Sequence, residues 1–175
     1  MTIHTLVVGK LQENCYVVVN KKNEAIVIDP GDNFAKIKEA YQNYHVHAIM
    51  ITHRHFDHIG ALEPLQKDTN AKVLEYSNLE EKQYQIGPFS FEVIFTKGHS
   101  KDSVTYYFKE QNCMFVGDFI FQNSIGRMDL EGGSEIDMKH SIEHIKTYPS
   151  NTFLYPGHGP STTLEQEKRY NPFFK

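Results

Sequence analysis

The sequence of 175 residues contains no tryptophan and only two cysteines, Cys15 and Cys113. Two cysteines cannot form the disulfide framework of a small secreted protein, and both lie in apolar, strand-like stretches. We therefore expect buried free thiols, with a single disulfide as the alternative. No stretch approaches the ~18 consecutive apolar residues of a membrane span. The start of the chain also lacks the features of a signal peptide, so we expect a cytoplasmic protein without a membrane partner.

An excess of positive charge is also missing. The chain has 18 Lys and Arg against 22 Asp and Glu, which gives a formal net charge of −4. Nucleic-acid-binding domains usually carry a basic surplus, so we expect a small-molecule substrate and no nucleic acid. Hydrophobic residues make up 39% of the chain, which is typical of a soluble globular protein. Without repeats or linkers, residues 1–175 are predicted to form a single domain.

Strand-like and helix-like segments alternate along the whole chain. Short segments rich in β-branched and aromatic residues predict strands at Ile3–Val8, Tyr16–Val19, Ala25–Ile28, Val46–Ile51, Lys72–Tyr76, Phe89–Phe95, Val104–Phe108, Cys113–Val116 and Thr152–Tyr155. Helical periodicity and capping residues predict helices at Phe34–Tyr44, Gly60–Lys67, from Ser134 to about Tyr148, and at Leu164–Tyr170. This mixture indicates an α/β architecture with more than one sheet layer.

Potential metal ligands recur where predicted strands end. The first such loop is the run from Thr52 to Gly60, and three later loops each add one residue. The candidates in these four loops are His53, His55, Asp57, His58, His99, Asp118 and His158. Imidazole and carboxylate groups suit Zn²⁺, Fe²⁺ or Mn²⁺. Such a joint pattern is much more specific than any single histidine, so we expect a metal centre.

The spacing within the first loop indicates two ions. Residues two apart in an extended segment point the same way, so His53 and His55 can bind one ion. A tight turn into the helix near Gly60 would then present Asp57 and His58 to a second ion. Because each ion needs about three or four protein ligands, the set supplies two sites only if one carboxylate bridges them.

Several motifs support a family resemblance. They are Asn14-Cys15-Tyr16, Asp29-Pro30-Gly31, the histidine-rich run, Gly117-Asp118, Ser124-Ile125-Gly126-Arg127 and Pro156-Gly157-His158-Gly159-Pro160. With these motifs the chain resembles the metallo-β-lactamase fold superfamily, and within it the small glyoxalase II-like hydrolases. The resemblance implies a four-layer αββα sandwich with two mixed sheets and with the metals at one edge.

The same resemblance implies a role for each candidate ligand. The first metal would be held by His53, His55 and His99, and the second by Asp57, His58 and His158. Asp118 would bridge the two ions, and Asp57 and Asp118 would take part in catalysis. Position 118 carries an Asp rather than a Cys, and in this respect the chain resembles glyoxalase II. The implied cofactor is a pair of divalent ions, with zinc expected and iron or manganese as alternatives.

Arg127 is the candidate substrate-binding residue. It lies nine residues after Asp118, where glyoxalase II-like proteins have a Lys that contacts substrate. A guanidinium can bind a substrate carboxylate through two parallel hydrogen bonds, whereas the alternative is an ordinary surface ion pair. Full-length glyoxalase II also has a C-terminal helical domain that helps to bind glutathione, and we expect none in these residues.

These features predict a dinuclear metal-dependent hydrolase. The expected substrate is a thioester such as an S-(hydroxyacyl) thiol conjugate, attacked by a metal-activated hydroxide. The alternative is an oxidoreductase similar to the mononuclear iron persulfide dioxygenases, which share the fold. A nuclease is disfavoured by the acidic balance of the chain, and an intact ligand set disfavours a metal-binding protein without catalysis.

A second histidine motif is not expected to bind metal. His140 and His144 formally match the H-x-x-E-H pattern of a metalloprotease class. Met138, Ile142 and Ile145 form the apolar stripe of the same predicted helix, so the two histidines should face solvent. The remaining histidines, at positions 4, 45 and 47, have no ligand pattern around them and are treated as structural.

Overall fold

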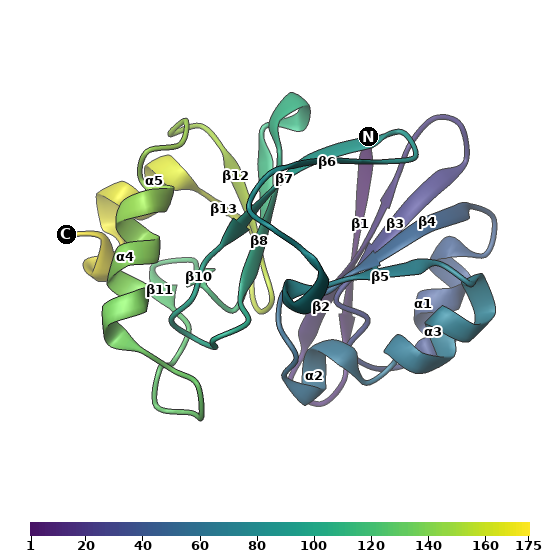
Figure 1. Ribbon diagram of the computed structural model, residues 1–175, viewed down its shortest axis with the longest axis horizontal. Helices are drawn as coiled ribbons and strands as arrows, with labels where there is room; N and C mark the ends of the chain where they lie inside the picture. The colour runs from purple at the N-terminus through teal and green to yellow at the C-terminus, as the bar shows by residue number, and fades with distance from the viewer.

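The computed structural model describes residues 1–175 and contains two large mixed sheets that pack face to face (Figure 1). The first sheet has the order β1-β2-β3-β4-β5. Its strands are β1 (Thr2–Val8), β2 (Glu13–Val19), β3 (Glu24–Ile28), β4 (His45–Met50) and β5 (Lys72–Leu74). The pairs β1–β2 and β2–β3 are antiparallel, whereas β3–β4 and β4–β5 are parallel.

The second sheet has the order β13-β12-β9-β8-β7-β6. Its strands are β6 (Gln83–Ile86), β7 (Phe89–Phe95), β8 (Val104–Phe108), β9 (Cys113–Gly117), β12 (Phe153–Pro156) and β13 (Thr162–Thr163). Only β12 and β9 pair in parallel, and the other neighbours are antiparallel. A separate small hairpin consists of β10 (Ile120–Phe121) and β11 (Ser124–Ile125).

Helices cover the outer face of each sheet. Figure 1 shows α1 and α3 on the first sheet and α4 and α5 on the second. The α-helices are α1 (Phe34–Tyr41), α2 (Phe56–Ile59), α3 (Leu62–Thr69), α4 (Glu135–Ile145) and α5 (Leu164–Tyr170). Three 3₁₀ turns complete the chain, η1 (Tyr76–Asn78), η2 (Lys109–Gln111) and η3 (Pro172–Phe174). No helix is both long enough and apolar enough to cross a membrane.

The central strands are apolar along their length because both of their faces are buried. In β2, Tyr16 and Val18 point into the core between the two sheets. The alternate residues Cys15 and Val17 point instead into the core beneath α1 and α3. A third core lies between the second sheet and α4 and α5. This alternation yields four layers, and the predicted αββα sandwich is confirmed.

A buried hydroxyl group links the two sheets close to the end of β4. Tyr106 of β8 is fully buried in the core between the sheets. Its hydroxyl donates hydrogen bonds to the carbonyl oxygens of Ile51, at 2.7 Å, and Leu74, at 3.1 Å. Because Ile51 immediately precedes the histidine-rich loop, this contact fixes the start of that loop against the opposite sheet.

Most predicted elements are present, and the differences lie at short or polar segments. The helix predicted at Gly60–Lys67 is present as α3, which begins and ends two residues later, at Leu62 and Thr69. The short helix α2, which ends just before Gly60, was not predicted. The strands β6, β10, β11 and β13 were not predicted. Three of them have only two residues, and β6 is an edge strand of largely polar sequence, so neither length nor pattern marks them.

Two smaller predictions are confirmed. Cys15 and Cys113 are buried free thiols. Ser134 is the N-cap of α4, and its side chain accepts a hydrogen bond from the backbone of Asp137.

We expect the substitution Tyr106→Phe to lower the free energy of unfolding by about 1–3 kcal/mol, because it leaves a buried carbonyl without its donor. Urea denaturation would measure the change. Tyr170→Phe is the matched control, since Tyr170 is 58% exposed and should change stability by less than about 0.5 kcal/mol. An unchanged midpoint for Tyr106→Phe would contradict the role of this link between the sheets.

Candidate metal centre

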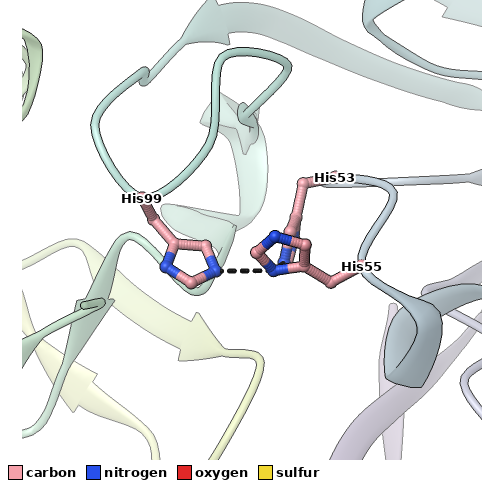
Figure 2. A group of neighbouring side chains, drawn as sticks. All are labelled: His53, His55 and His99. Atoms are coloured by element: carbon pink, nitrogen blue, oxygen red, sulfur yellow. Dashed lines mark hydrogen bonds between the residues drawn. The ribbon is translucent and has the colours of Figure 1, made fainter. Parts of the chain in front are cut away.

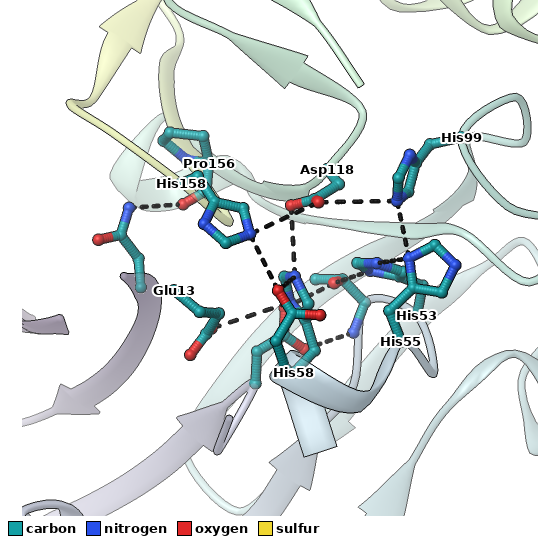
Figure 3. A network of polar contacts seen from close by, with 12 residues as sticks. Glu13, His53, His55, His58, His99, Asp118, Pro156 and His158 are labelled. Carbon is teal, nitrogen blue, oxygen red and sulfur yellow. Dashed lines mark hydrogen bonds and ion pairs between the residues drawn. The ribbon is translucent and has the colours of Figure 1, made fainter. Parts of the chain in front are cut away.

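Six of the candidate ligands lie together between the two sheets in Figure 3, and the seventh, Asp57, belongs to the same cluster. The first four follow β4, where the chain leaves the first sheet. The others come from the second sheet, with His99 between β7 and β8, Asp118 directly after β9 and His158 two residues after the end of β12. Because β9 and β12 are parallel neighbours, their carboxyl ends present Asp118 and His158 side by side.

The first group of ligand atoms consists of three imidazole nitrogens (Figure 2). The Nδ1 atom of His55 lies 3.1 Å from Nε2 of His53 and 2.9 Å from Nε2 of His99. Each of these residues offers one atom to a set whose members all lie within 4.8 Å of one another. Three converging nitrogens of this kind match the ligand set of a tetrahedral metal site with one open position.

The second group combines one carboxylate with two imidazoles. Nε2 of His158 lies 3.2 Å from Oδ2 of Asp57, and Nε2 of His58 lies 3.8 Å from the same oxygen. These three residues also form a set with ligand atoms within 4.8 Å. His58 is fully buried, whereas Asp57 and His158 are partly exposed. The second group is therefore open to solvent on one side.

The carboxylate of Asp118 lies between the two groups (Figure 3). Its Oδ2 atom is 3.6 Å from Nε2 of His99 in the first group. The same oxygen is 3.6 Å from Nε2 of His158, and Oδ1 is 3.3 Å from Nε2 of His58, both in the second group. Asp118 therefore has the position that a bridging carboxylate requires.

Outer hydrogen bonds orient three of the imidazoles. Nδ1 of His99 donates to the carbonyl oxygen of Arg127 at 2.7 Å, and Nδ1 of His158 donates to that of Leu11 at 3.1 Å. Nδ1 of His53 lies 3.1 Å from the hydroxyl oxygen of Thr52. When Nδ1, which points away from the site, carries the proton, Nε2 keeps the lone pair that a metal needs.

Asp29 orients the imidazole of His58 in the same way, whereas in the sequence Asp29 was assigned only to a motif of the family resemblance. Its Oδ2 atom accepts from Nδ1 of His58 at 3.0 Å and from the hydroxyl of Thr52 at 2.6 Å. Its Oδ1 atom accepts from the backbone N–H of Thr52 at 2.7 Å. Asp29 is buried with a φ of +47°, a conformation that is uncommon for a non-glycine residue. A buried carboxylate directly after a strand was the signal that could have identified it.

The surroundings of the site shift the pKa values of two neighbouring histidines in opposite directions. Burial, together with nearby imidazoles, lowers the pKa of His53 well below its usual range. Burial also opposes the charged form of His58, but the carboxylates of Asp118 and Asp29 outweigh it and raise its pKa well above that range. The same contact with His58 holds the pKa of Asp118 low despite its burial. A cation at this position is thus favoured electrostatically.

Two buried atoms of the site support the fit of divalent metal ions. Nε2 of His58 and Oδ1 of Asp118 are both inaccessible to solvent and have no hydrogen-bond partner. Buried polar atoms without partners are rare and costly, and an ion is one of the groups that can satisfy them. Since Nδ1 of His58 is already bonded to Asp29, its Nε2 is free to bind a metal. The donor atoms of both groups therefore fit divalent ions.

Glu13 is a further buried carboxyl group beside this site. Neither of its oxygens has a hydrogen-bond partner, and Oε1 lies 3.8 Å from Nδ1 of His58. Burial, and secondly the charge of Asp29, raise the pKa of Glu13 to about 10. Glu13 was not among the predicted site residues because nothing in its sequence surroundings distinguishes it from an ordinary residue of a strand.

The structure separates the other candidates from the ligand cluster. Arg127 contributes its backbone carbonyl to His99, while its exposed guanidinium forms two hydrogen bonds with Asp129, of 2.7 and 2.6 Å. His140 and His144 are exposed on α4 and join no ligand group, as predicted.

An αββα sandwich with a His/Asp cluster at the edge between its sheets defines a class of metallo-hydrolases. The family model described as "Metallo-beta-lactamase superfamily" matches this chain in two overlapping segments, residues 8–85 and 75–158. The chain belongs to the metallo-beta-lactamase superfamily.

Two named relatives span almost the whole chain. The probable metallo-hydrolase YqgX of Bacillus subtilis is 33% identical over 199 residues, which cover 95% of this chain and 94% of the relative. The hydroxyacylglutathione hydrolase GloC of Haemophilus influenzae is 26% identical, with 99% of this chain and 98% of the relative covered.

Three solved structures are similar to this chain over nearly its whole length. The B3 metallo-beta-lactamase BLEG-1 has a TM-score of 0.96 at 32% identity, covering 99% of this chain and 100% of the other. The protein TTHA1623 in a di-iron-bound form has a TM-score of 0.90 at 32% identity, with 97% and 99% covered. ETHE1 from Myxococcus xanthus has a TM-score of 0.88 at 26% identity, with 98% and 84% covered.

We expect Asp29→Asn to weaken the binding of one divalent ion by about 10- to 100-fold, because the variant loses an oxygen that orients His58. Asparagine tolerates the positive φ, so the loop should keep its shape. Competition with a chromophoric chelator would measure the affinity of each ion. Asp68→Asn is the control, since Asp68 pairs with Lys38 and Tyr41 away from the site. Equal metal affinities in both variants would show that Asp29 has no part in metal binding.

Proposed function

We propose that the protein is a dinuclear metal-dependent hydrolase of thioesters, with S-(hydroxyacyl) thiol conjugates as substrates. The observation that carries this proposal is the position of Asp118, whose two oxygens face both groups of ligand atoms. A bridging carboxylate is expected where two ions share one water molecule. The similarity to a hydroxyacylglutathione hydrolase supports the thioester as substrate.

In this proposal each group of ligands holds one ion. His53, His55 and His99 hold the first, and Asp57, His58 and His158 hold the second, with Asp118 shared between them. We propose zinc as the native metal. Iron is the alternative, supported by the di-iron form of the similar protein TTHA1623, because His and carboxylate ligands suit both metals.

The bound ions would supply Lewis acidity and lower the pKa of a shared water toward ~7, so that hydroxide forms at neutral pH. Asp57 uses Oδ2 toward His58 and His158, which leaves Oδ1 to accept a hydrogen bond from the attacking water. Outer hydrogen bonds keep the imidazoles of His99 and His158 in place during the reaction. A thiolate leaving group needs little protonation, because the pKa of a free thiol is about 8.5. This chemistry favours a thioester over an amide.

The proposed reaction can be tested with purified protein and S-lactoylglutathione. Removal of metal by a chelator should abolish hydrolysis, and two equivalents of Zn²⁺ should restore it. Asp118→Asn should lower kcat/KM at least about 100-fold, because it removes charge and one oxygen from the shared position. Metal analysis of the same samples would give the number of ions per chain.

The control for these measurements is His140→Ala, which removes an exposed histidine of α4 that contacts no ligand. It should retain both the metal content and the turnover of the unchanged protein. One ion per chain with full activity, or full activity after removal of His58, would contradict the dinuclear proposal.

Two other reactions are alternatives. The first alternative is β-lactam hydrolysis, which is supported by the similarity to the B3 enzyme BLEG-1. Hydrolysis of a chromogenic cephalosporin would detect it. A mononuclear iron oxidoreductase of the persulfide dioxygenase type would instead consume oxygen in the presence of glutathione persulfide. Either activity without thioester hydrolysis would replace the proposed function.

We also propose that Arg127 binds a carboxylate of the substrate by exchanging Asp129 for it. Both side chains are exposed, at 62% and 66%, so the exchange needs no rearrangement of the core. Arg127→Ala should then raise KM by about three- to tenfold at nearly constant kcat, since the contact is the same in the ground and transition states. Asp129→Asn should lower KM, because it frees the guanidinium. Steady-state kinetics would test both, with Arg169→Ala as a control that should leave KM unchanged.

A further inference from the structure

A cleft of about 320 Å³ opens beside the second group of ligands. It lies between the turn that joins β1 to β2, the loop that follows β3, and the start of α2. Asp57 lines the cleft and also belongs to the ligand cluster, so the cleft borders the metal centre. The rest of the lining consists of Val8, Gly9, Lys10, Leu11, Gly31, Asp32, Phe56 and Gly60.

The rim of this cleft carries large apolar side chains that are open to solvent. Phe56 is 75% exposed and Leu11 is 54% exposed. Phe56 directly precedes Asp57, and Leu11 belongs to the β1–β2 turn, so two separate segments place an exposed apolar side chain at the same opening. Exposed apolar residues that gather at a concave surface are a typical sign of a binding site.

The cleft is formed where three backbone segments come close together. A β-carbon at Gly31 would collide with the backbone oxygen of Asp57 and with the side chain of Glu13. A β-carbon at Gly60 would collide with the backbone oxygen of Gly31. The shape of the cleft therefore depends on glycines, because only residues without a side chain allow these segments to approach so closely.

The β1–β2 turn is tied to the metal centre. The carbonyl oxygen of Leu11 accepts the hydrogen bond from Nδ1 of His158, and Glu13 forms an isolated β-bridge with the same histidine. The backbone of Leu11 is thus held at a defined position relative to the second group of ligands.

The charges of the cleft disfavour an anionic occupant. Its one cation, Lys10, is offset by the carboxylate of Asp32, and Asp57 contributes a further carboxylate. An anionic part of a substrate would instead be attracted to Arg127, whose backbone contacts His99 of the first group. The two ends of a substrate centred on the cluster thus meet different surroundings.

From this arrangement we infer that the cleft binds the side chain of the acyl group, and that the protein prefers 2-hydroxyacyl thioesters with an apolar alkyl or aryl substituent. This inference rests on the proposed thioester hydrolysis. The anionic thiol part of the substrate lies on the side of Arg127, and the acyl substituent lies against Phe56 and Leu11.

The kinetic test compares glutathione thioesters that differ only in the acyl group. S-(2-hydroxyhexanoyl)glutathione has three more methylenes than S-lactoylglutathione, and each fully buried methylene contributes about fourfold. We expect kcat/KM to be at least about tenfold higher for the longer acyl group, because the cleft is partly open. Phe56→Ser and Leu11→Ser should each reduce this ratio to below about threefold.

Ile136→Ser is the matched control, because Ile136 is 71% exposed on α4 and lies outside the cleft. It should retain the tenfold ratio. All three substitutions replace exposed side chains, so folding should be preserved. A ratio near one in the unchanged protein, or an equal ratio in all variants, would overturn the inference.

A binding experiment separates this inference from the proposed reaction. S-Hexylglutathione is a thioether that cannot be hydrolysed, and ¹H–¹⁵N spectra of the protein report its binding. We expect saturable shifts at the amides of Gly9, Gly31 and Gly60, smaller shifts with S-methylglutathione, and loss of the difference in Phe56→Ser. Such shifts without any thioester hydrolysis would retain the cleft as an apolar site while refuting the proposed function. Equal shifts with both thioethers, or shifts confined to residues outside this cleft, would overturn the inference.

Discussion

The hydrogen bond between Asp29 and Nδ1 of His58 is the contact on which the organisation of the metal centre depends. It joins the end of β3, where Asp29 lies, to the loop that follows β4, where His58 lies. Because β3 and β4 are parallel neighbours, both residues leave the sheet at the same edge. Thr52 donates two more hydrogen bonds to the same carboxylate and so holds the loop in register. The inner nitrogen of a fully buried imidazole is thereby directed at the site, where rotation of the ring would break the bond to Asp29.

The two-sheet architecture supplies the other half of this arrangement. The first sheet delivers the histidine-rich loop, and the second delivers Asp118 and His158 from the carboxyl ends of two parallel strands. Neither sheet alone holds a complete ligand set. Contacts that fix one sheet against the other, such as the hydroxyl of Tyr106 on the carbonyl of Ile51, therefore also fix the distances within the metal centre. Stability of the core and geometry of the site depend on the same interface.

Sequence patterns predicted the layers and the ligand cluster because both follow from short-range rules. Period-two and continuous apolar runs mark buried strands, and ligands at strand ends converge when those strands share an edge. The same rules could not predict the partners of Asp29 or Glu13, which depend on packing between segments distant in sequence. They predicted a turn near Gly60 but missed the short helix α2 before it and the contact between Gly60 and the backbone of Gly31. That contact depends on how two loops pack against each other, not on the secondary-structure propensity of either loop.

Strand ends and turns contribute differently to function. The ligand atoms are held by strand ends and by buried hydrogen bonds, so a change there would disturb metal binding and the fold together. Leu11 and Phe56, in contrast, are exposed side chains whose backbones are fixed but whose identity supports no core. Substitutions at such positions can alter which substrate group fits beside the ligand cluster without moving a ligand. The reaction type is therefore a property of the sandwich edge, whereas substrate preference is a property of the short segments that border it.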